Sequence, residues 1–392
     1  AVAASLLLYL KRRLQSRRIL SSSYLHRAAQ DPSCVANRSL MIASFLEDVA
    51  QPLEKLHPPP LSSPLALRFV TWNLNILCGP DWNTPISAAS VARLLAQFEA
   101  DVLVLQEMPN EALDSKWSGF LTEPLKRVRE LDEILKDAGY TLLRSEADNS
   151  TLLALSSSRL DVQATEAFNL DCQGPVVHIN GKEVWSESRG ARCVLVRPIQ
   201  HEASSLESFA PFVIYATHLH HKDATLVMAG SDMQGPSTGH SASEWAEAST
   251  QTGVRAREVE ALLDHWEGWR SKHAPSGAIV LADFNQPLQH NYSKEEWRII
   301  SAGLTSPAVS QPLDDGVETL LRSHGFRCAY DVCEDNNFGG RPAPPLTHWT
   351  GTTVDFAYVT GGAWRVHGAY LVLSPLSDHL PVIFDVIADD GS

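Results

Sequence analysis

The sequence predicts an α/β fold for the part of the chain that begins near Leu65, and two observations indicate this class. Short apolar runs rich in β-branched and aromatic residues recur along the chain, as β-strands require. Between several of these runs, apolar residues recur with the spacing of an amphipathic helix. We therefore expect residues 65–392 to form the folded body and residues 1–64 to form a separate N-terminal segment.

Eight apolar runs are predicted to be strands. In chain order they are LRFVTW (67–72), DVLVLQ (101–106), ARCVLVRP (191–198), FVIYATH (212–218), GAIVLAD (277–283), TVDFAYVT (353–360), GAYLVL (368–373) and LPVIFDVI (380–387). Residues 86–100 and 125–139 have helical spacing and end at polar or glycine positions. Residues 254–270 carry apolar residues close to one helical face, which predicts a third helix packed on the core.

The charge of the chain is acidic and unevenly distributed. The net charge is −14, but the first thirty residues contain six basic residues and no acid, so the remaining chain carries −20. Non-specific binding to long nucleic acids depends on Lys and Arg at the phosphates. The body is therefore a poor match for a long polyanion, unless cations bridge the contact or the substrate is small or locally recognised.

The first thirty residues are basic, contain serine and lack acids, as organelle transit peptides do. Their apolar run of about ten residues is shorter than the roughly 20 that span a bilayer. We expect an intracellular protein. Its first thirty residues serve organellar targeting, form part of a membrane anchor, or form a helix with no targeting function. Membrane contact is expected only through this segment.

Two further segments are predicted not to join the strands and helices. Prolines and serines in LHPPPLSSPLAL (56–67) are typical of a linker. Residues 225–253 are rich in glycine and serine and form either a lid beside the site or a disordered insertion. Six scattered cysteines without metal-binding spacing indicate reduced thiols.

Most predicted strands end in, or are followed by, a polar residue that can bind metal or phosphate. These residues are Asn73, Glu107, His218, Asp283 and Asn285, followed later in the chain by Asp355, Asp378 and His379. Carboxylates and imidazoles are costly to place beside a core without partners. Each position alone has an ordinary structural explanation, but their joint occurrence predicts one shared site.

With these residues in the order TWN, LQE, THL, DFN, TVDFAYV and SDHLPV, the chain resembles the endonuclease/exonuclease/phosphatase superfamily. The match extends across residues 67–387, and SDH and DFN are its most specific parts. The resemblance implies one DNase I-like domain, a four-layered α/β sandwich of two packed, mainly antiparallel β-sheets flanked by helices.

The resemblance also implies a hydrolase that requires Mg²⁺, with Mn²⁺ as an alternative. Hard oxygen ligands suit Mg²⁺, so Glu107 is the first predicted ligand, with Asn73 and Asp378 close to the metal. Asp283 is predicted to be the general base and Asn285 to align the water or a phosphoryl oxygen.

Three further roles concern the histidines and arginines. His379 is expected to be held by Asp355, the dyad that the family match implies. His218 is predicted to contact the phosphate or to protonate the leaving oxygen. Arg189 and Arg192 in SRGAR are candidate phosphate ligands, whereas His220 and His221 are interpreted as surface residues.

The sequence leaves the substrate open. The first hypothesis is a phosphodiesterase or nuclease acting on nucleic-acid ends, with Tyr292, His348 and Trp349 as candidate rings for base stacking on single strands. The second is a phosphomonoesterase acting on a small phosphorylated metabolite or lipid headgroup. The third is an inactive binding module with the same fold. No obligate protein partner is indicated.

Overall fold

The computed structural model describes residues 58–61, 66–80, 84–109, 122–144, 150–173, 177–179, 182–185, 188–199, 210–220, 254–294, 296–297, 300, 316–338, 341, 343–344, 346–349, 351–361 and 364–388. The expectations for residues 1–30 and for residues 225–253 lie outside this set and stay predictions, as does the domain boundary near residue 65. Within the described residues, no helix is both long enough and apolar enough to cross a membrane.

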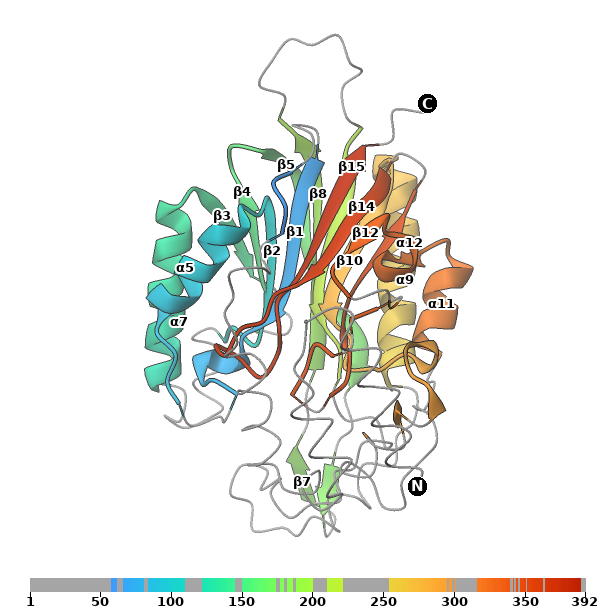
Figure 1. Cartoon of the computed structure of the whole chain (residues 1–392). Helices are drawn as coiled ribbons and strands as arrows, with labels where there is room; N and C mark the ends of the chain where they lie inside the picture. The colour runs from blue at the N-terminus through green and yellow to red at the C-terminus, as the bar shows by residue number, and fades with distance from the viewer. Residues whose placement is uncertain are drawn as a thin grey trace, which may run out of the picture.

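Two mixed β-sheets form the centre of the fold (Figure 1). The seven-stranded sheet has the order β12-β14-β15-β1-β2-β4-β3 and the six-stranded sheet the order β11-β13-β10-β9-β8-β5. Their strands are β1 (Ala66–Asn73), β2 (Val102–Gln106), β3 (Tyr140–Arg144), β4 (Leu152–Ser156), β5 (Leu160–Gln173), β8 (Ser188–Pro198), β9 (Phe212–His218), β10 (Ala278–Asp283), β11 (Arg327–Cys328), β12 (Asp335–Asn336), β13 (Asp355–Thr360), β14 (Trp364–Leu371) and β15 (Val382–Ala388). A separate hairpin consists of β6 (Val177–Ile179) and β7 (Lys182–Trp185).

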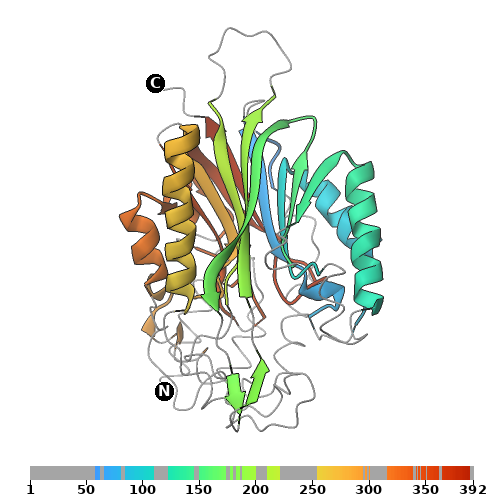
Figure 2. The same ribbon diagram turned by 180° about the vertical axis from the view of Figure 1, so that it is seen from behind.

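Helices cover the outer faces of the two sheets. They are α5 (Ala88–Phe98), α7 (Thr122–Asp137), α9 (Val254–His273), α11 (Val317–Ser323) and α12 (Ala329–Val332), with short 3₁₀ turns η2 (Asn75–Leu77) and η3 (Gln289–Asn291). Figures 1 and 2 show α5 and α7 on one side of the paired sheets and α9 and α11 on the other. The predicted four-layered α/β sandwich is confirmed.

The layers follow from the side-chain alternation of the central strands. Leu67 and Phe69 of β1 belong to the core that includes the second sheet, whereas Val70 and Trp72 pack in the core under α5 and α7. Successive residues of a strand point to opposite faces. Thr71 and Asn73 therefore share the face of Leu67 and Phe69, which is turned toward the other sheet.

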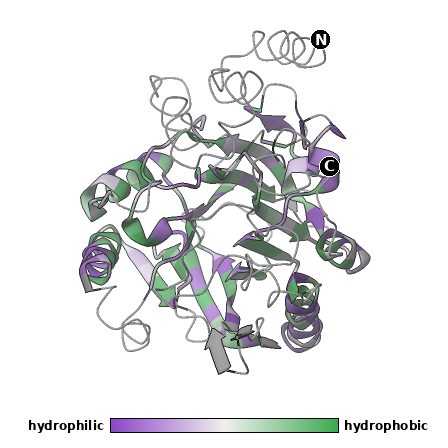
Figure 3. Cartoon of the chain, turned by 90° about the horizontal axis from the view of Figure 1, so that it is seen from below, coloured by the Kyte–Doolittle hydropathy of each residue, from purple (hydrophilic) through white to green (hydrophobic). Residues whose placement is uncertain are grey.

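All eight predicted strands are present, with boundaries that differ by a few residues. The three predicted helices correspond to α5, α7 and α9. The strands β3, β4 and β5 were not predicted from sequence. Most side chains of β5 between Leu160 and Leu170 are half-buried or exposed. The strand therefore lacks the apolar run that reveals a buried strand in the sequence. Figure 3 shows mostly hydrophobic residues on the central strands, whereas the surrounding helices carry both hydrophobic and hydrophilic residues.

A charged cluster attaches the segment after β10 to the helices beside it. Nδ1 of His290 lies 3.4 Å from Oε2 of Glu318, and its Nε2 lies 3.7 Å from Oδ1 of Asp331. Hydrogen bonds to Asp331 and to Glu318 raise the pKa of His290 to about 9. The same contacts hold the pKa of the Asp331 carboxyl below its ordinary range.

We predict that His290→Gln lowers the free energy of unfolding at pH 6 and leaves it unchanged at pH 10. The pKa of His290 is raised in the folded state, so its contribution is complete below the ordinary pKa of about 6.5 and is lost as pH rises through about 9. Urea unfolding of both proteins at each pH measures the difference. An equal loss of unfolding free energy at pH 6 and pH 10 would contradict the link between His290 protonation and stability.

Candidate active site

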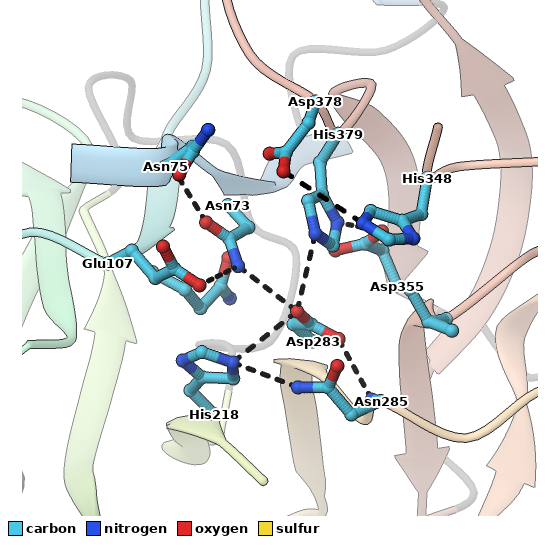
Figure 4. Close-up of polar contacts among 12 residues, drawn as sticks. Asn73, Asn75, Glu107, His218, Asp283, Asn285, His348, Asp355, Asp378 and His379 are labelled. Atoms are coloured by element: carbon cyan, nitrogen blue, oxygen red, sulfur yellow. Dashed lines mark hydrogen bonds and ion pairs between the residues drawn. The ribbon is translucent and has the colours of Figure 1, made fainter. Parts of the chain in front are cut away.

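The predicted polar residues meet at one edge of the two sheets (Figure 4). β1 and β2 are parallel neighbours with Asn73 opposite Gln106, so Asn73 and Glu107 leave the first sheet together. β9 and β10 are also parallel, with Asp283 opposite His218. Strand register therefore brings these four residues to the same edge.

The remaining predicted residues reach this edge from the opposite direction. β13 runs antiparallel to β10, and its first residue, Asp355, lies opposite Asp283. Asp355 thus begins its strand, whereas the sequence suggested a position in mid-strand. His379 lies in the loop before β15, where its carbonyl oxygen accepts a hydrogen bond from Nε1 of Trp72 at 2.9 Å.

The side-chain amide of Asn73 connects the two sheets. Its Nδ2 donates to Oε1 of Glu107 at 3.0 Å and to Oδ2 of Asp283 at 3.1 Å. Its Oδ1 accepts from the backbone N–H of Asn75 at 2.9 Å. Ionised carboxylates only accept hydrogen bonds, so the atom of Asn73 that faces both of them is the amide nitrogen. These contacts therefore fix the orientation of the amide.

Asp283 lies at the centre of the cluster and is almost completely buried. Its Oδ1 accepts from the backbone N–H of Asn285 at 2.8 Å. Besides Asn73, its Oδ2 has Nε2 of His218 at 3.4 Å and Nε2 of His379 at 3.7 Å. The carboxylate is thus held in one position by groups from both sheets.

The expected pairing of His379 with Asp355 is present in the geometry. Nδ1 of His379 lies 3.0 Å from Oδ2 of Asp355, and both side chains are buried. A carboxylate at this distance fixes the ring orientation and stabilises the imidazolium. Asp355 is therefore a positioning residue for His379, whose Nε2 faces Asp283.

Burial and charge shift the protonation of this pair of groups. Burial raises the pKa of the Asp283 carboxyl, an effect that His379 opposes and Asp355 reinforces. Burial alone would lower the pKa of His379. Three carboxylates outweigh that effect and raise its pKa, those of Asp355, Asp283 and Asp378. The surrounding carboxylates therefore favour the imidazolium form of His379.

Left-handed backbone conformations accompany the strand ends. Glu107 has φ 53°, Asn285 has φ 52°, and the three residues of η2 have φ of 46°, 55° and 57°. Such values are uncommon for non-glycine residues, and Ile76, which is β-branched, is strongly disfavoured there. Backbone strain of this kind is characteristic of functional sites. It turns the chain sharply at the point where Glu107 and Asn285 enter the cluster.

The oxygen donors fit a hard divalent cation on the Glu107 side. Within the described chain, the one hydrogen bond that the Glu107 carboxylate accepts comes from Asn73, so the carboxylate keeps free lone pairs, while its backbone oxygen accepts from the N–H of Ile76. Asp378 presents a carboxylate from the loop before β15, on the side of His348 and His379. Asn73 presents its amide nitrogen to Glu107 and so positions that carboxylate. The roles of Glu107, Asn73 and Asp378 in metal binding stay predictions.

His218 and Arg189 contact each other beneath Asp283. Nη1 of Arg189 lies 3.2 Å from Nδ1 of His218, and Nε2 of His218 lies 2.9 Å from Nδ2 of Asn285. Both side chains are buried. Since both ring nitrogens of His218 face protein groups, the geometry favours positioning of Asp283 and Asn285 over proton donation to a leaving oxygen.

Two buried charged residues of α9 support these strand ends from outside the cluster. Arg255 donates to the carbonyl oxygen of Asn285, and Oε2 of Glu258 accepts from the backbone N–H of His220 at 3.1 Å. The Nδ1 of His220 also contacts Oε1 of Glu258. His220 and Glu258 are 0% exposed, so the surface interpretation of His220 was wrong. His221 lies outside the described residues.

Three other sequence-based candidates lie elsewhere or serve the fold. Nε of Arg192 donates to the carbonyl oxygen of Arg144 at 2.9 Å, so its guanidinium faces β3 and the predicted phosphate contact is not supported. Trp349 is buried in the core, and the hydroxyl of Tyr292 accepts from the backbone N–H of Thr353. Trp349 is therefore not available for stacking, and the half-buried ring of Tyr292 packs against Trp297.

His348 is the one predicted ring that lies at the cluster. Its ring centroid is 4.4 Å from that of His379, and its Nε2 is 3.9 Å from Oδ2 of Asp378. This place agrees with the expectation that His348 lies beside the site, and its stacking on a base stays a prediction.

Comparison with known families and structures agrees with this geometry. The sequence model described as the Endonuclease/Exonuclease/phosphatase family matches residues 70–379. No match is found among curated protein sequences.

Three solved structures show the same fold at low sequence identity. A Bacteroides thetaiotaomicron protein of the endonuclease/exonuclease/phosphatase family has a TM-score of 0.52 and 12% identity, covering 83% of this chain and 99% of its own. The mannosyl-6-phosphatase of Bacteroides thetaiotaomicron VPI-5482 has a TM-score of 0.51 and 13% identity, covering 82% and 99%. A conserved protein of unknown function from Enterococcus faecalis V583 has a TM-score of 0.50 and 13% identity, covering 82% and 100%.

We predict that Glu258→Ala destabilises the fold by about 1–3 kcal/mol, because it removes the buried acceptor that Glu258 offers to the backbone N–H and the ring of His220. Glu258→Gln keeps an acceptor for the His220 N–H and should cost less. Glu260→Ala, at an exposed position of the same helix, is the matched control and should change stability by less than about 0.5 kcal/mol. Urea unfolding measures all three. Equal losses for Glu258→Ala and Glu260→Ala would contradict a structural role for the pair.

Proposed function

The chain belongs to the endonuclease/exonuclease/phosphatase family, whose sequence model matches most of its length, and we propose that it is a divalent-metal-dependent phosphoester hydrolase. The observation that carries this proposal is the buried Asp283 carboxylate, placed between the metal-side Glu107 and the Asp355–His379 dyad. Base, cation ligands and a positively charged imidazole are the groups that hydrolysis of a phosphate ester requires.

A divalent cation held by Glu107 and Asp378 would neutralise negative charge on the phosphoryl oxygens. The donor set suits Mg²⁺ or Mn²⁺, since both residues supply carboxylate oxygens.

Each remaining group has a role that its contacts support. Asp283 takes the proton of the attacking water, because burial raises its pKa and so strengthens it as a base. The imidazolium of His379, held by Asp355, stabilises the charge that develops on the phosphoryl group. Asn285 is anchored through its side chain to His218 and to the carbonyl oxygen of Leu219, which keeps its backbone N–H on Asp283.

A small phosphorylated molecule is our first candidate substrate. Two of the three rings expected to stack on a nucleobase, Tyr292 and Trp349, are engaged in the fold. The acidic body, at −20 outside the first thirty residues, also disfavours polyanions. The second candidate is a phosphodiester at a single-stranded nucleic-acid end, which His348 favours because its partly exposed ring lies beside His379.

The substrate experiment uses the purified full chain with Mg²⁺ or Mn²⁺ and three probes. These are p-nitrophenyl phosphate, bis(p-nitrophenyl) phosphate and a short single-stranded oligonucleotide with a labelled 5′-phosphate. Hydrolysis of the monoester or release of phosphate from an intact strand supports a phosphomonoesterase. Cleavage of the diester or shortening of the strand supports a phosphodiesterase.

We predict that Asp283→Asn lowers kcat by roughly 10²–10⁴-fold, the range attributed to general acid–base catalysis. The substitution removes the base but keeps the size of the side chain, so the protein should still fold. Asp161→Asn, at an exposed position of β5, is the matched control and should keep full activity. Activity of Asp283→Asn close to wild type would move the base to another residue, and an inactive wild type on all three probes would refute the proposed reaction.

A further inference from the structure

Three groups of potential metal ligands occur among the described residues. Asp283, Asp355 and His379 belong to the site already described. His290, Glu318 and Asp331 have Arg322 ion-paired with both carboxylates, so a cation already occupies that position. The third group consists of His348, Asp378 and His379.

We propose that His348, Asp378 and His379 bind a divalent transition-metal ion of the Zn²⁺ type, and that this ion inhibits the reaction. The ion-binding part stands on the geometry alone, whereas the inhibitory part rests on the proposed function.

The three side chains converge in space (Figure 4). One ligand atom from each residue lies within 4.8 Å of the others. Nε2 of His348 is 3.9 Å from Oδ2 of Asp378, and the two imidazole rings have centroids 4.4 Å apart. Bonds of about 2.0–2.2 Å to a shared ion require only a modest further approach of these atoms.

Backbone pairing holds the residues together independently of any ion. The backbone N–H of Trp349 donates to the carbonyl oxygen of Asp378 at 2.8 Å, and that of Leu380 donates to Thr347 at 2.7 Å. An isolated antiparallel bridge joins His348 to His379. The arrangement is therefore fixed by the fold, unlike a chance meeting of flexible surface side chains.

Of the three side chains, that of His348 is the most exposed to solvent. The side chains of Asp378 and His379 are 3% and 6% exposed, whereas that of His348 is 19% exposed. An ion would therefore enter past His348, and three protein ligands would leave one coordination position open, as in many zinc sites.

Asp378 is shared with the proposed Mg²⁺ position, and the two positions differ in their other ligands, which are two imidazoles here and the Glu107 carboxylate there. Two imidazoles and one carboxylate are a donor set for Zn²⁺ or Co²⁺, whereas Mg²⁺ selects oxygen ligands. Asp355 adds the carboxylate that commonly supports a metal-binding histidine through its other ring nitrogen. Its Oδ1 is buried and has no hydrogen-bond partner among the described residues.

An ion bound here would remove His379 from the reaction. A ring nitrogen of His379 that is bound to the ion carries no proton, so it cannot donate to a phosphoryl oxygen, and any proton it held is released to solvent. Zn²⁺ is therefore expected to inhibit in the presence of saturating Mg²⁺.

The binding test uses chelator-treated full-length protein titrated with Co²⁺, whose visible absorption reports nitrogen ligation. We expect His348→Ala to weaken the affinity for Co²⁺ at the absorbing site at least tenfold, and His348→Asn to do the same if the alanine variant does not fold. His290→Ala is the matched control from the second histidine–carboxylate group and should bind like wild type. Unchanged binding in the folded His348 variants, or loss of the absorption in His290→Ala, would overturn the site.

The activity test measures inhibition by Zn²⁺ at fixed Mg²⁺. The Zn²⁺ concentration for half-inhibition should rise in His348→Ala by the same factor as the loss in Co²⁺ affinity. Binding through His348 without inhibition would refute the inhibitory role and leave the site in place. A wild type inactive on every phosphoester would refute the proposed function, and the Co²⁺ titration would still decide the site.

Discussion

The amide of Asn73 is the contact on which the site depends, because it joins a carboxylate of one sheet to a carboxylate of the other. Its two N–H groups hold Glu107 and Asp283, and its oxygen accepts from the chain that turns away at Asn75. Without this donor, two acidic groups would face each other in a buried setting, which costs free energy. The packing of the two sheets therefore fixes the distance between Glu107, the proposed cation ligand, and Asp283, the proposed base.

The fold accepts local strain and buried charge around this contact. Left-handed residues at Glu107 and Asn285 turn the chain at the strand ends. Two buried residues of α9 contact the chain beside these strand ends without belonging to the cluster. Arg255 donates to the carbonyl oxygen of Asn285, and Glu258 accepts from the backbone N–H of His220. Charged groups placed in an apolar layer do not maximise stability. Their contacts with the strand ends that carry Asn285 and His218 explain why they are there.

Much of this arrangement is predictable from sequence. Apolar runs reveal the buried strands, and the polar residues that end them identify Asn73, Glu107, His218 and Asp283, because strand register alone brings such residues together. What sequence cannot supply is the direction of a side chain outside a regular element. Within β8, Arg189 and Arg192 are three residues apart and so lie on opposite faces, toward His218 and Arg144, and the sequence alone did not say which face borders the site. His220 was misjudged because its partner, Glu258, is distant in sequence, and His348 gained its place through loop pairing that no local pattern marks.

The most direct test of this account is kcat/KM for Asn73→Leu at saturating Mg²⁺. Leucine keeps the approximate size of asparagine and removes both hydrogen bonds, so the variant should fold while Glu107 and Asp283 lose their fixed separation. Misplacement of reacting groups by about 1 Å can cost about 10²-fold in rate, and a fall of roughly that size is the result we predict. A value within twofold of wild type would contradict the claim that the Asn73 amide organises the site.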